Sequence, residues 1–309
     1  MLHNLIQDSS RTAADNGYLL QFPVCKLTIP FFPHCSEPKS LLLLQKSNVD
    51  YKKPTHSDQS KRRLNPFLPF DPHSFVCEIT DEHVILLNKF IAIEGHCLIV
   101  TKKFVPQWSP VTPLDSLALA KVLLDMDCLV FFNCGSLTGA SQPHKHFQFL
   151  PLPLSNECSV YCPLNNLISD SKLPFGEVCS LPQFKFNHAL VRFSGYSNEE
   201  DFQQLIHSSY ISIMERLEIH TGHYTKLLEC HRFEDVDDFY DVQVNLPCYS
   251  LIVTRKFMFI VRRKAASAFG IEANSSAFAG SLFVRTQEQL DHVSKIGLIG
   301  VLEELSEEK

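Results

Sequence analysis

The sequence lacks the features of a secreted disulfide scaffold. None of its 11 cysteines forms a Cys-x-x-Cys pair, and the closest two, Cys158 and Cys162, stand apart from the rest. The amino terminus has no basic segment followed by an apolar stretch, so we expect no secretory signal. An odd number of cysteines without such a signal indicates reduced thiols. We therefore expect a cytoplasmic protein.

Long hydrophobic runs and positive net charge are also missing. The apolar stretches fall short of the roughly 20 residues that cross a bilayer, so no membrane association is expected. The formal net charge of −6 argues against binding to a nucleic-acid polymer. A small anionic ligand would need a local basic pocket. The candidate cations for such a pocket are Lys89, Lys102, Lys103, Lys145, Arg255, Lys256, Arg262, Arg263 and Lys264.

Glycine is scarce, with 11 residues, and phenylalanine is abundant, with 24, as in a well-packed globular protein. Apolar runs and their turn residues predict strands over 83–90, 97–101, 145–154, 249–253, 257–261 and 278–284. The polar, proline-punctuated stretch of residues 54–72 is expected to be an exposed loop.

Three helices are predicted from their capping residues. Thr112 followed by Pro113 begins the first helix. Ser197 with Glu200 forms a capping box for the second, and Thr286 begins a short carboxy-terminal helix. Strands and helices do not alternate regularly, which predicts an α+β fold with an antiparallel sheet and packed helices.

One strand carries an unusual set of polar side chains. Side chains alternate between the faces of a strand, so His144, His146 and Gln148 project from one side. Phe147 and Phe149 project from the other side and are expected to anchor the strand in the core. Three polar groups in register are rare in a purely structural strand, because each needs a partner when it is buried.

A loop of small, polar residues precedes this strand at positions 133–142. Its glycines allow close approach of a ligand, and successive backbone N–H groups can bind phosphate oxygens. Loop and strand together predict a nucleotide site. Three other interpretations stay open from the residues alone: a His-x-His metal site, two satisfied core histidines, and a simple turn at residues 139–141.

The segment resembles the active site of diadenosine tetraphosphate phosphorylases, also called ATP adenylyltransferases, in the histidine-triad superfamily. The resemblance rests on Asn133-Cys134-Gly135 and on Gly139-Ala140-Ser141-Gln142-Pro143-His144-Lys145-His146-Phe147-Gln148. Weaker similarity extends upstream to Asn65-Pro66-Phe67, Leu87-Asn88-Lys89-Phe90, His96 and Val100-Thr101, and downstream to Tyr249–Lys256 and Asn274-Ser275-Ser276. It implies a histidine-triad-like fold, with residues 1–165 containing the His-x-His-x-Gln site and residues 166–309 completing the nucleotide site.

The resemblance also implies a reaction and a set of roles. His146 would attack the α-phosphorus of diadenosine tetraphosphate and release ATP, and inorganic phosphate would then attack the adenylyl-histidine and yield ADP. His144 would position the nucleophile, and Gln148 would hydrogen-bond the transferring phosphoryl oxygens. Substrate binding would fall to Lys53, Asn88, Lys89, Asn133, Gly139, Ala140, Ser141, Gln142, Asn274 and Ser275.

Gln148 distinguishes transfer from hydrolysis. Hydrolases of the superfamily typically have histidine at this position, whereas transferases have glutamine, so transfer to phosphate is favoured. A dinucleoside-polyphosphate hydrolase, another nucleotidyltransferase on the same scaffold and a non-enzymatic nucleotide-binding module are the alternatives.

The sequence departs from the family pattern in two places. Ser250 stands where the family usually has asparagine after a tyrosine, which affects a base or ribose contact. The amino-terminal lysine has three candidates, Lys46, Lys52 and Lys53, and spacing favours Lys53. No cysteine pair for structural zinc is present, and no protein metal site is expected. A divalent cation, Mg²⁺, is expected to accompany the polyphosphate, and the protein is expected to be a monomer or a homodimer.

Overall fold

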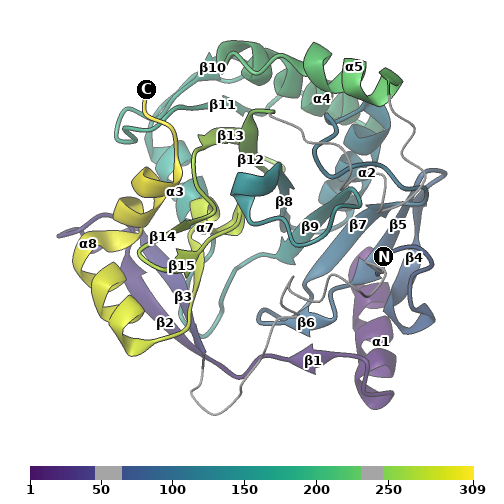
Figure 1. The fold of residues 1–309 in the computed structure, drawn as a ribbon, viewed down its shortest axis with the longest axis horizontal. Coiled ribbons are helices and arrows are strands. Elements are labelled where there is room, and N and C mark those ends of the chain that lie inside the picture. Colours follow the sequence, from purple (N-terminus) through teal and green to yellow (C-terminus); the bar gives the residue numbers. More distant parts are fainter. Residues whose placement is uncertain (46–64, 231–245) are drawn as a thin grey trace.

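The computed structural model describes residues 1–45, 65–230 and 246–309 (Figure 1). The helices are α1 Leu2–Asp15, α2 Pro113–Asp125, α3 Pro163–Asp170, α4 Glu199–Arg216, α5 Thr221–Cys230, α7 Ser276–Ala279 and α8 Gln287–Leu305. The strands are β1 Leu20–Gln21, β2 Val24–Pro30, β3 Lys39–Gln45, β4 Phe75–Thr80, β5 His83–Leu87, β6 Phe90–Ile91, β7 Cys97–Thr101, β8 Cys128–Cys134, β9 His146–Pro151, β10 Val178–Cys179, β11 His188–Arg192, β12 Cys248–Val253, β13 Phe257–Arg263, β14 Ser267–Ala268, β15 Ile271–Glu272 and β16 Ser281–Val284. Two short 3-10 helices, Pro72–Ser74 and Ser136–Thr138, complete the described elements.

A nine-stranded sheet in the order β10-β11-β13-β12-β8-β9-β7-β5-β4 forms the centre of the fold. All of its neighbouring strands pair antiparallel, so the predicted α+β fold is confirmed. Strands β4, β5, β7, β8 and β9 of this sheet come from the first half of the chain, and β10 to β13 come from the second. The two halves join where β8 pairs with β12, with Asn133 opposite Ser250. A smaller sheet, β16-β3-β2, lies beside the large one.

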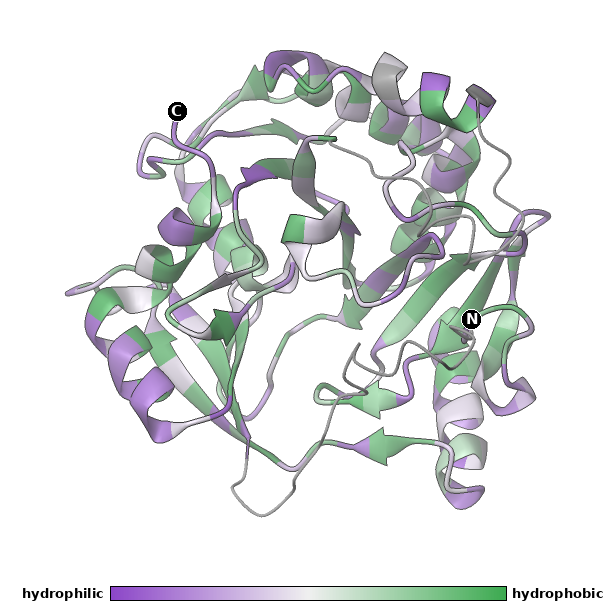
Figure 2. Cartoon of the chain, in the orientation of Figure 1, coloured by the Kyte–Doolittle hydropathy of each residue, from purple (hydrophilic) through white to green (hydrophobic). Residues whose placement is uncertain are grey.

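Each face of the large sheet carries its own hydrophobic core. Along β8, Val130 and Phe132 belong to a core that also contains α2 and α4, whereas Leu129 and Phe131 belong to a core with α3, α7 and α8. Figure 2 shows the strands coloured mainly as hydrophobic, while α8 mixes hydrophobic and hydrophilic residues. The sheet is thus buried on both sides, and polar residues inside it need partners from the protein.

The capping signals in the sequence placed two helix starts correctly. Thr112 and Asp115 form a reciprocal capping box at α2, with Pro113 in the first turn. At α8 the Thr286 side chain accepts a hydrogen bond from the Gln289 backbone N–H. The predicted cap of α4 was wrong by one residue: the side chain of Asn198, not Ser197, accepts the bond from the Asp201 backbone N–H.

Three further expectations need correction. Residue Phe278 lies in α7 and not in a strand, since the chain turns at Gly280 before β16 begins. The carboxy-terminal helix is long, and Gly297 kinks it. The predicted exposed loop of residues 54–72 lies in part outside the described residues, and its Phe67 is buried. Within the described ranges, no helix has both the length and the apolar content that a membrane crossing requires.

Candidate active site

The three polar residues of the His-x-His-x-Gln motif lie on one face of β9 and the residue before it. His144, His146 and Gln148 are at most 9% exposed. The alternation predicted for this strand is confirmed, because Phe147 and Phe149 pack into the opposite core. On the motif's own face, Gln148 lies between Leu98 of β7 and Phe131 of β8. These two neighbours belong to separate apolar clusters, so the motif occupies the gap between them.

Hydrogen bonding fixes which nitrogen of His146 is free. Its Nδ1 lies 2.8 Å from the carbonyl oxygen of His144, and a carbonyl can only accept, so Nδ1 carries the hydrogen. The lone pair is then on Nε2, which has no hydrogen-bond partner among the described residues. Burial lowers the pKa of His146 to about 4. Near neutral pH the ring is therefore uncharged, with a nucleophilic Nε2.

His144 is held from both ring nitrogens. Its Nε2–H donates to the carbonyl oxygen of Thr101 at 2.8 Å, and its Nδ1 accepts from Asn65 Nδ2 at 2.9 Å. The rings of Phe67 and Phe104 pack against it at centroid distances of 5.8 and 5.3 Å. Burial lowers its pKa to about 4. The ring is a neutral, rigid support whose backbone carbonyl orients His146.

Gln148 contacts a third histidine. His96 Nε2 lies 3.0 Å from Gln148 Oε1, and Asn88 Nδ2 lies 3.2 Å from His96 Nδ1 and 3.3 Å from His96 Nε2. Burial lowers the pKa of His96 to about 4, so this ring is neutral as well. Asn88, which the sequence placed near the nucleotide, thus lies two hydrogen bonds away from the motif strand through His96.

The loop of residues 133–142 requires glycine at two positions. Gly135 has φ +90°, and a Cβ there would lie 2.5 Å from the sulfur of Cys248. Gly139 has φ +76° and packs against Ala273 and Asn274. Ala140 and Gln142 are half-buried, and Ser141 is exposed. The loop therefore lies directly beside the distant segment that contains Asn274.

Asn133 and Ser275, far apart in the sequence, are direct partners. The Asn133 Oδ1 atom accepts from the Ser275 backbone N–H at 2.8 Å and from its hydroxyl at 2.6 Å. The Asn133 side chain is buried, and its Nδ2 has no hydrogen-bond partner among the described residues. Asn274 accepts from the Ser276 N–H and hydroxyl. The structure thus leaves a buried amide donor next to the loop.

Ser250, the departure from the family pattern, binds a buried arginine. Arg263 Nη1 donates to Ser250 Oγ at 3.0 Å, and its Nη2 donates to the carbonyl oxygens of Ala265 and Ala273 at 2.9 Å each. Burial lowers the pKa of Arg263 to about 10. Through these hydrogen bonds, Arg263 links the segment that precedes Asn274 to β12.

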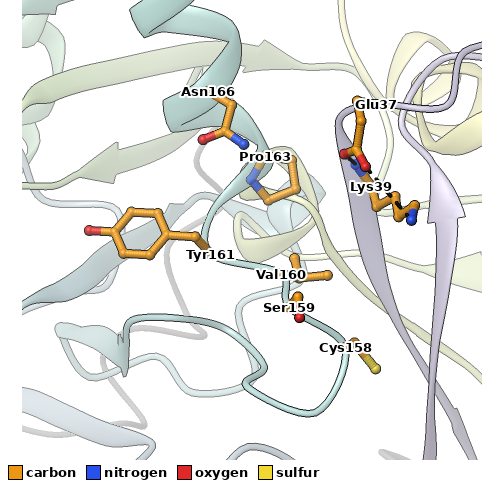
Figure 3. Close-up of a pocket in the computed structure, with 8 residues that line it drawn as sticks. All are labelled: Glu37, Lys39, Cys158, Ser159, Val160, Tyr161, Pro163 and Asn166. Carbon is orange, nitrogen blue, oxygen red and sulfur yellow. Dashed lines mark hydrogen bonds and ion pairs between the residues drawn. The ribbon is translucent and has the colours of Figure 1, made fainter.

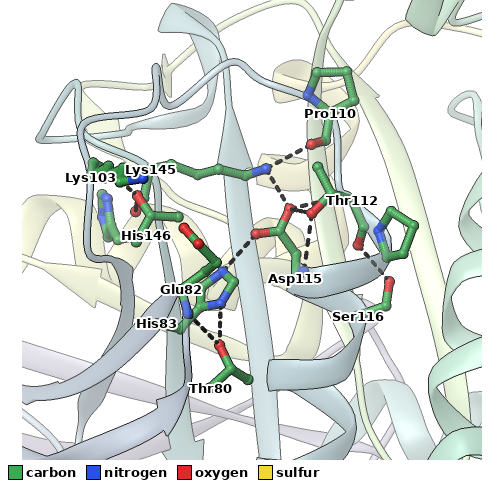
Figure 4. Close-up of polar contacts among 12 residues, drawn as sticks. Thr80, Glu82, His83, Lys103, Pro110, Thr112, Asp115, Ser116, Lys145 and His146 are labelled. Carbon is green, nitrogen blue, oxygen red and sulfur yellow. Dashed lines mark hydrogen bonds and ion pairs between the residues drawn. The ribbon is translucent and has the colours of Figure 1, made fainter. Parts of the chain in front are cut away.

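On the opposite face of the motif strand lies a buried ion network (Figure 4). Lys145 Nζ is 2.6 Å from Asp115 Oδ2, and His83 Nε2 is 2.9 Å from Asp115 Oδ1. Lys145 also donates to the carbonyl oxygen of Pro110 at 2.6 Å. Burial alone would raise the pKa of Asp115, but Lys145 and hydrogen bonds from His83 and Thr112 hold that pKa below its usual value.

Several candidate cations are not at the motif. Lys89 is exposed and lies over the ring of Tyr18 at 5.2 Å. Lys102 pairs with Glu78, and Arg262 pairs with Glu307. The three amino-terminal lysine candidates, Lys46, Lys52 and Lys53, lie outside the described residues.

Sequence reasoning assigned no role to two residues that hold the motif strand. The Gln107 side chain accepts from the His146 N–H at 2.8 Å and donates to the carbonyl oxygen of Asn133 at 2.9 Å, so it bridges β8 and β9 where their pairing ends. Thr101 contacts His144. Thr101 belongs to a segment that resembles the family, but nothing local in the sequence indicates the partner of either residue, because each partner lies far along the chain.

A small polar pocket lies elsewhere, between β3 and the start of α3 (Figure 3). It is lined by Glu37, Lys39, Cys158, Ser159, Val160, Tyr161, Pro163 and Asn166. No residue of the motif or of the glycine-serine loop lines it, so it is not the site of the proposed chemistry.

The family models that match this fold define the chain as a nucleotidyltransferase. Residues 37–170 match the Ap4A phosphorylase N-terminal domain, and residues 182–308 match the ATP adenylyltransferase C-terminal domain. Between them these matches span most of the chain. The chain belongs to the Ap4A phosphorylase and ATP adenylyltransferase family, and it is a nucleotidyltransferase that acts on Ap4A, diadenosine tetraphosphate.

Similar proteins are known from Saccharomyces cerevisiae. Diadenosine 5',5'''-P1,P4-tetraphosphate phosphorylase 2 is 25% identical, over 79% of this chain and 76% of the relative. Protein APA1 is 24% identical, over 94% of this chain and 89% of the relative. The crystal structure of yeast Ap4A phosphorylase Apa2 in complex with AMP has a TM-score of 0.76 at 22% identity, covering 100% of this chain and 98% of that one. Apa2 has also been solved in complex with Ap4A, with a TM-score of 0.74.

Proposed function

We propose that the chain cleaves diadenosine tetraphosphate with inorganic phosphate, giving ATP and ADP, through an adenylyl group carried on Nε2 of His146. One observation carries this proposal. The His144 carbonyl oxygen holds the Nδ1 hydrogen of His146, which leaves a neutral Nε2 with its lone pair on the face of the motif. A neutral imidazole near neutral pH is a good nucleophile, and a covalent intermediate divides a difficult displacement into two easier steps.

In the first step, Nε2 of His146 forms a bond to the α-phosphorus, and the bond to the bridging oxygen breaks with ATP as the leaving group. The adenylylated ring is a cation, and its Nδ1–H stays hydrogen-bonded to the His144 carbonyl. In the second step, a phosphate oxygen attacks the same phosphorus, the phosphorus–nitrogen bond breaks, and ADP leaves. The imidazole returns neutral, with its Nδ1 hydrogen in place.

The remaining roles follow the residues that surround His146. Gln148 hydrogen-bonds the transferring phosphoryl oxygens, and His144 positions the nucleophile. Hydrogen-bond donors that face developing charge are commonly the largest contribution to such catalysis. The unpaired amide of Asn133 and the backbone of residues 139–142 bind the polyphosphate.

Three binding roles are less direct. Asn274 and Ser275 support Asn133 and the glycine-containing loop, because Ser275 donates to Asn133 Oδ1. We assign outer contacts to the nucleotide to Asn88 and Lys89, which lie away from His146, and the amino-terminal lysine contact to Lys53. Among the described residues, no group of three or more histidine, cysteine or acidic residues could hold a metal. We propose, as the family resemblance implies, that a Mg²⁺ ion arrives bound to the phosphates of the substrate.

Both halves of the chain contribute residues to the proposed site. Residues 1–165 carry the motif, and residues 166–309 contribute Ser275 and strand β12, which pairs with β8. The natural partners are then a dinucleoside polyphosphate, ATP, ADP and phosphate, in a cytoplasmic protein that is a monomer or a homodimer.

An isotope experiment tests the two-step reaction. With α-labelled diadenosine tetraphosphate and no phosphate, label should stay on the protein through an acid-labile histidine linkage. Adding phosphate should release it as ADP. Phosphate attacks without losing a proton to a base, whereas water needs a base that an amide such as Gln148 cannot provide. Rapid formation of AMP without phosphate, and without trapped label, would contradict the proposal and favour the hydrolase alternative.

A further inference from the structure

Two Asn-x-Phe turns face two different histidines around the motif. In each turn the phenylalanine backbone N–H donates to the asparagine Oδ1, at 3.0 Å from Phe67 to Asn65 and at 3.0 Å from Phe90 to Asn88. A backbone N–H can only donate, so these bonds identify the oxygen of each amide. The Nδ2 group of each asparagine therefore faces its histidine as a hydrogen-bond donor.

This donor selects the tautomer of His96. A nitrogen of neutral imidazole has either one hydrogen or one lone pair, so it serves one partner. Gln148 is the nearer partner of His96 Nε2, at 3.0 Å, which leaves Nδ1 to the Asn88 amide at 3.2 Å. Nδ1 must accept that bond, so the hydrogen of the ring is on Nε2. Because the pKa of His96 is lowered to about 4 by burial, the ring holds only this hydrogen near neutral pH.

The tautomer of His96 in turn sets the orientation of the Gln148 side-chain amide. His96 Nε2–H donates, so the atom of Gln148 that it meets is the carbonyl oxygen Oε1. The Nε2 amide group is then the other end of the side chain, and no residue in the described ranges accepts a hydrogen bond from it. This free donor stands two residues from His146 on the same face of the strand.

We propose that Asn88 and His96 are positioning residues that fix the side-chain amide of Gln148 with its NH₂ group toward the transferring phosphoryl oxygens. We call this set the Asn88–His96–Gln148 relay. It rests on the proposed function, because it needs Gln148 to meet the transferring group. A flipped amide would place its carbonyl oxygen against the phosphoryl oxygens, where two acceptors repel each other.

His144 shows why Asn88 matters at His96. The tautomer of His144 is held independently by the Thr101 carbonyl, which can only accept the Nε2 hydrogen. Within the described residues, no backbone carbonyl accepts a hydrogen bond from the His96 ring, whose partners are Asn88 and Gln148. Because the Gln148 amide can flip, Asn88 is the partner among the described residues that sets the His96 tautomer, and a change at Asn88 reaches Gln148 without moving the backbone of the motif strand.

Replacement of Asn88 by aspartate reverses this polarity without changing the side-chain shape. Asp at position 88 accepts from the Phe90 N–H with one oxygen and requires a hydrogen on His96 Nδ1 for the other. When the ring is neutral, Nε2 becomes an acceptor and the Gln148 amide flips. At lower pH the ring gains a second hydrogen, and the Nε2–H donor returns. A pH-dependent activity is therefore the signature of the relay.

The first measurement is kcat for Asn88→Asp relative to wild type between pH 5.5 and 9. We expect this ratio to fall at least about tenfold as pH rises, because a well-placed donor is lost, with a smaller change in KM. Asn88→Ala lacks the carboxylate and should lose activity equally at all pH values. The matched control is Asn16→Asp, because the exposed Asn16 faces His73 Nδ1 at 3.5 Å on the surface; its activity should follow wild type.

The second measurement needs no substrate. In protein labelled with ¹⁵N-histidine, the His96 resonance is identified by its loss in His96→Asn. NMR should show the hydrogen on Nε2 in wild type at pH 7.5 and on Nδ1 in Asn88→Asp at pH 9.

A wild-type ring with its hydrogen on Nδ1, in a protein that forms ATP and ADP, would contradict the relay but not the proposed function. So would a pH profile of Asn88→Asp that parallels that of Asn88→Ala. A protein with the expected tautomer but no phosphorolysis would contradict the proposed function and not the relay.

Discussion

The two faces of the motif strand solve the burial of polar groups in opposite ways. One face carries His144 and His146, which are buried as neutral rings with lowered pKa values of about 4. The other face carries Lys145, which is buried as an ion with Asp115 as its partner. The ionic side is closed, since each charge already has its counterion. The neutral side keeps a lone pair and an amide donor for a ligand, which is why chemistry belongs there.

The largest expected effect comes from removing the nucleophile on the neutral face. His146→Ala should lower kcat by about three orders of magnitude or more, because no neighbouring group can form the covalent intermediate in the same geometry. Steady-state formation of ADP measures the loss. Nucleotide binding, followed by calorimetry, should change little.

A matched control exists for this variant. His188 is another buried histidine with its Nδ1–H donated to a carbonyl, that of Phe186 at 2.8 Å, and with a pKa of about 4 lowered by burial. Its Nε2 accepts from the Leu181 N–H, so it cannot attack a phosphorus. His188→Ala should reduce stability and keep kcat. Activity near wild type in a folded His146→Ala protein would show that the mechanism is wrong.

The next largest effect is a loss of stability when the cation of the ionic face is removed. Lys145→Met leaves the buried carboxylate of Asp115 without its cation, and the free energy of unfolding should fall by about 3 to 5 kcal/mol. Chemical denaturation at pH 7 measures this change. The exposed ion pair of Arg11 and Asp8 provides the comparison, since Arg11→Met should change stability by less than about 1 kcal/mol. Equal losses in the two variants would refute the closed ionic network.

Gln148→Ala tests the donor on the neutral face. It should lower kcat more than it raises KM, with a cost of about 3 kcal/mol in transition-state stabilisation. The amide matters most when charge on the phosphoryl oxygens shifts during transfer. Kinetics over a range of diadenosine tetraphosphate concentrations separate the two constants. A change in KM alone would place Gln148 in ground-state binding.

The smallest effect is that of acid on the neutral face. His144 and His146 have folded pKa values near 4, below the usual 6.5, so the unfolded chain binds their protons first. Their contribution to stability is complete above about pH 6.5 and is lost as pH falls toward 4. Each should cost about 1 kcal/mol by pH 5.5.

Denaturation at several pH values measures this slope, and His144→Phe should make it shallower. Asp115 should add nothing in this window, because its lowered pKa keeps its carboxylate charged. A stability that stays constant from pH 7 to pH 5 would contradict the buried neutral rings.

Much of the fold could be predicted because its signals are local. Thr112 caps α2 as predicted, although its reciprocal bond with Asp115 was not foreseen, and the turn at residues 254–256 joins the hairpin of β12 and β13. The shift from Ser197 to Asn198 at α4 shows the limit of this reasoning. Adjacent polar residues compete for one cap, and backbone geometry decides between them.

The motif was predictable for a similar reason, since alternation along one strand places His144, His146 and Gln148 on one face whatever the rest of the fold. The partners of these residues were not predictable in this way. Gln107, Thr101 and His96 reach the motif across sheet pairings and loops, and no spacing in the sequence connects them.

By itself, the sequence determined that an antiparallel α+β protein would present two imidazoles and an amide beside a glycine-containing loop, because strand periodicity and residue type are local properties. Only the tertiary structure decided which nitrogen of His146 is free, that Asp115 is the counterion of Lys145, and that Ser275 contacts Asn133. Tautomers and buried charges depend on donors and acceptors brought from distant segments, and folding alone brings these groups within hydrogen-bond distance.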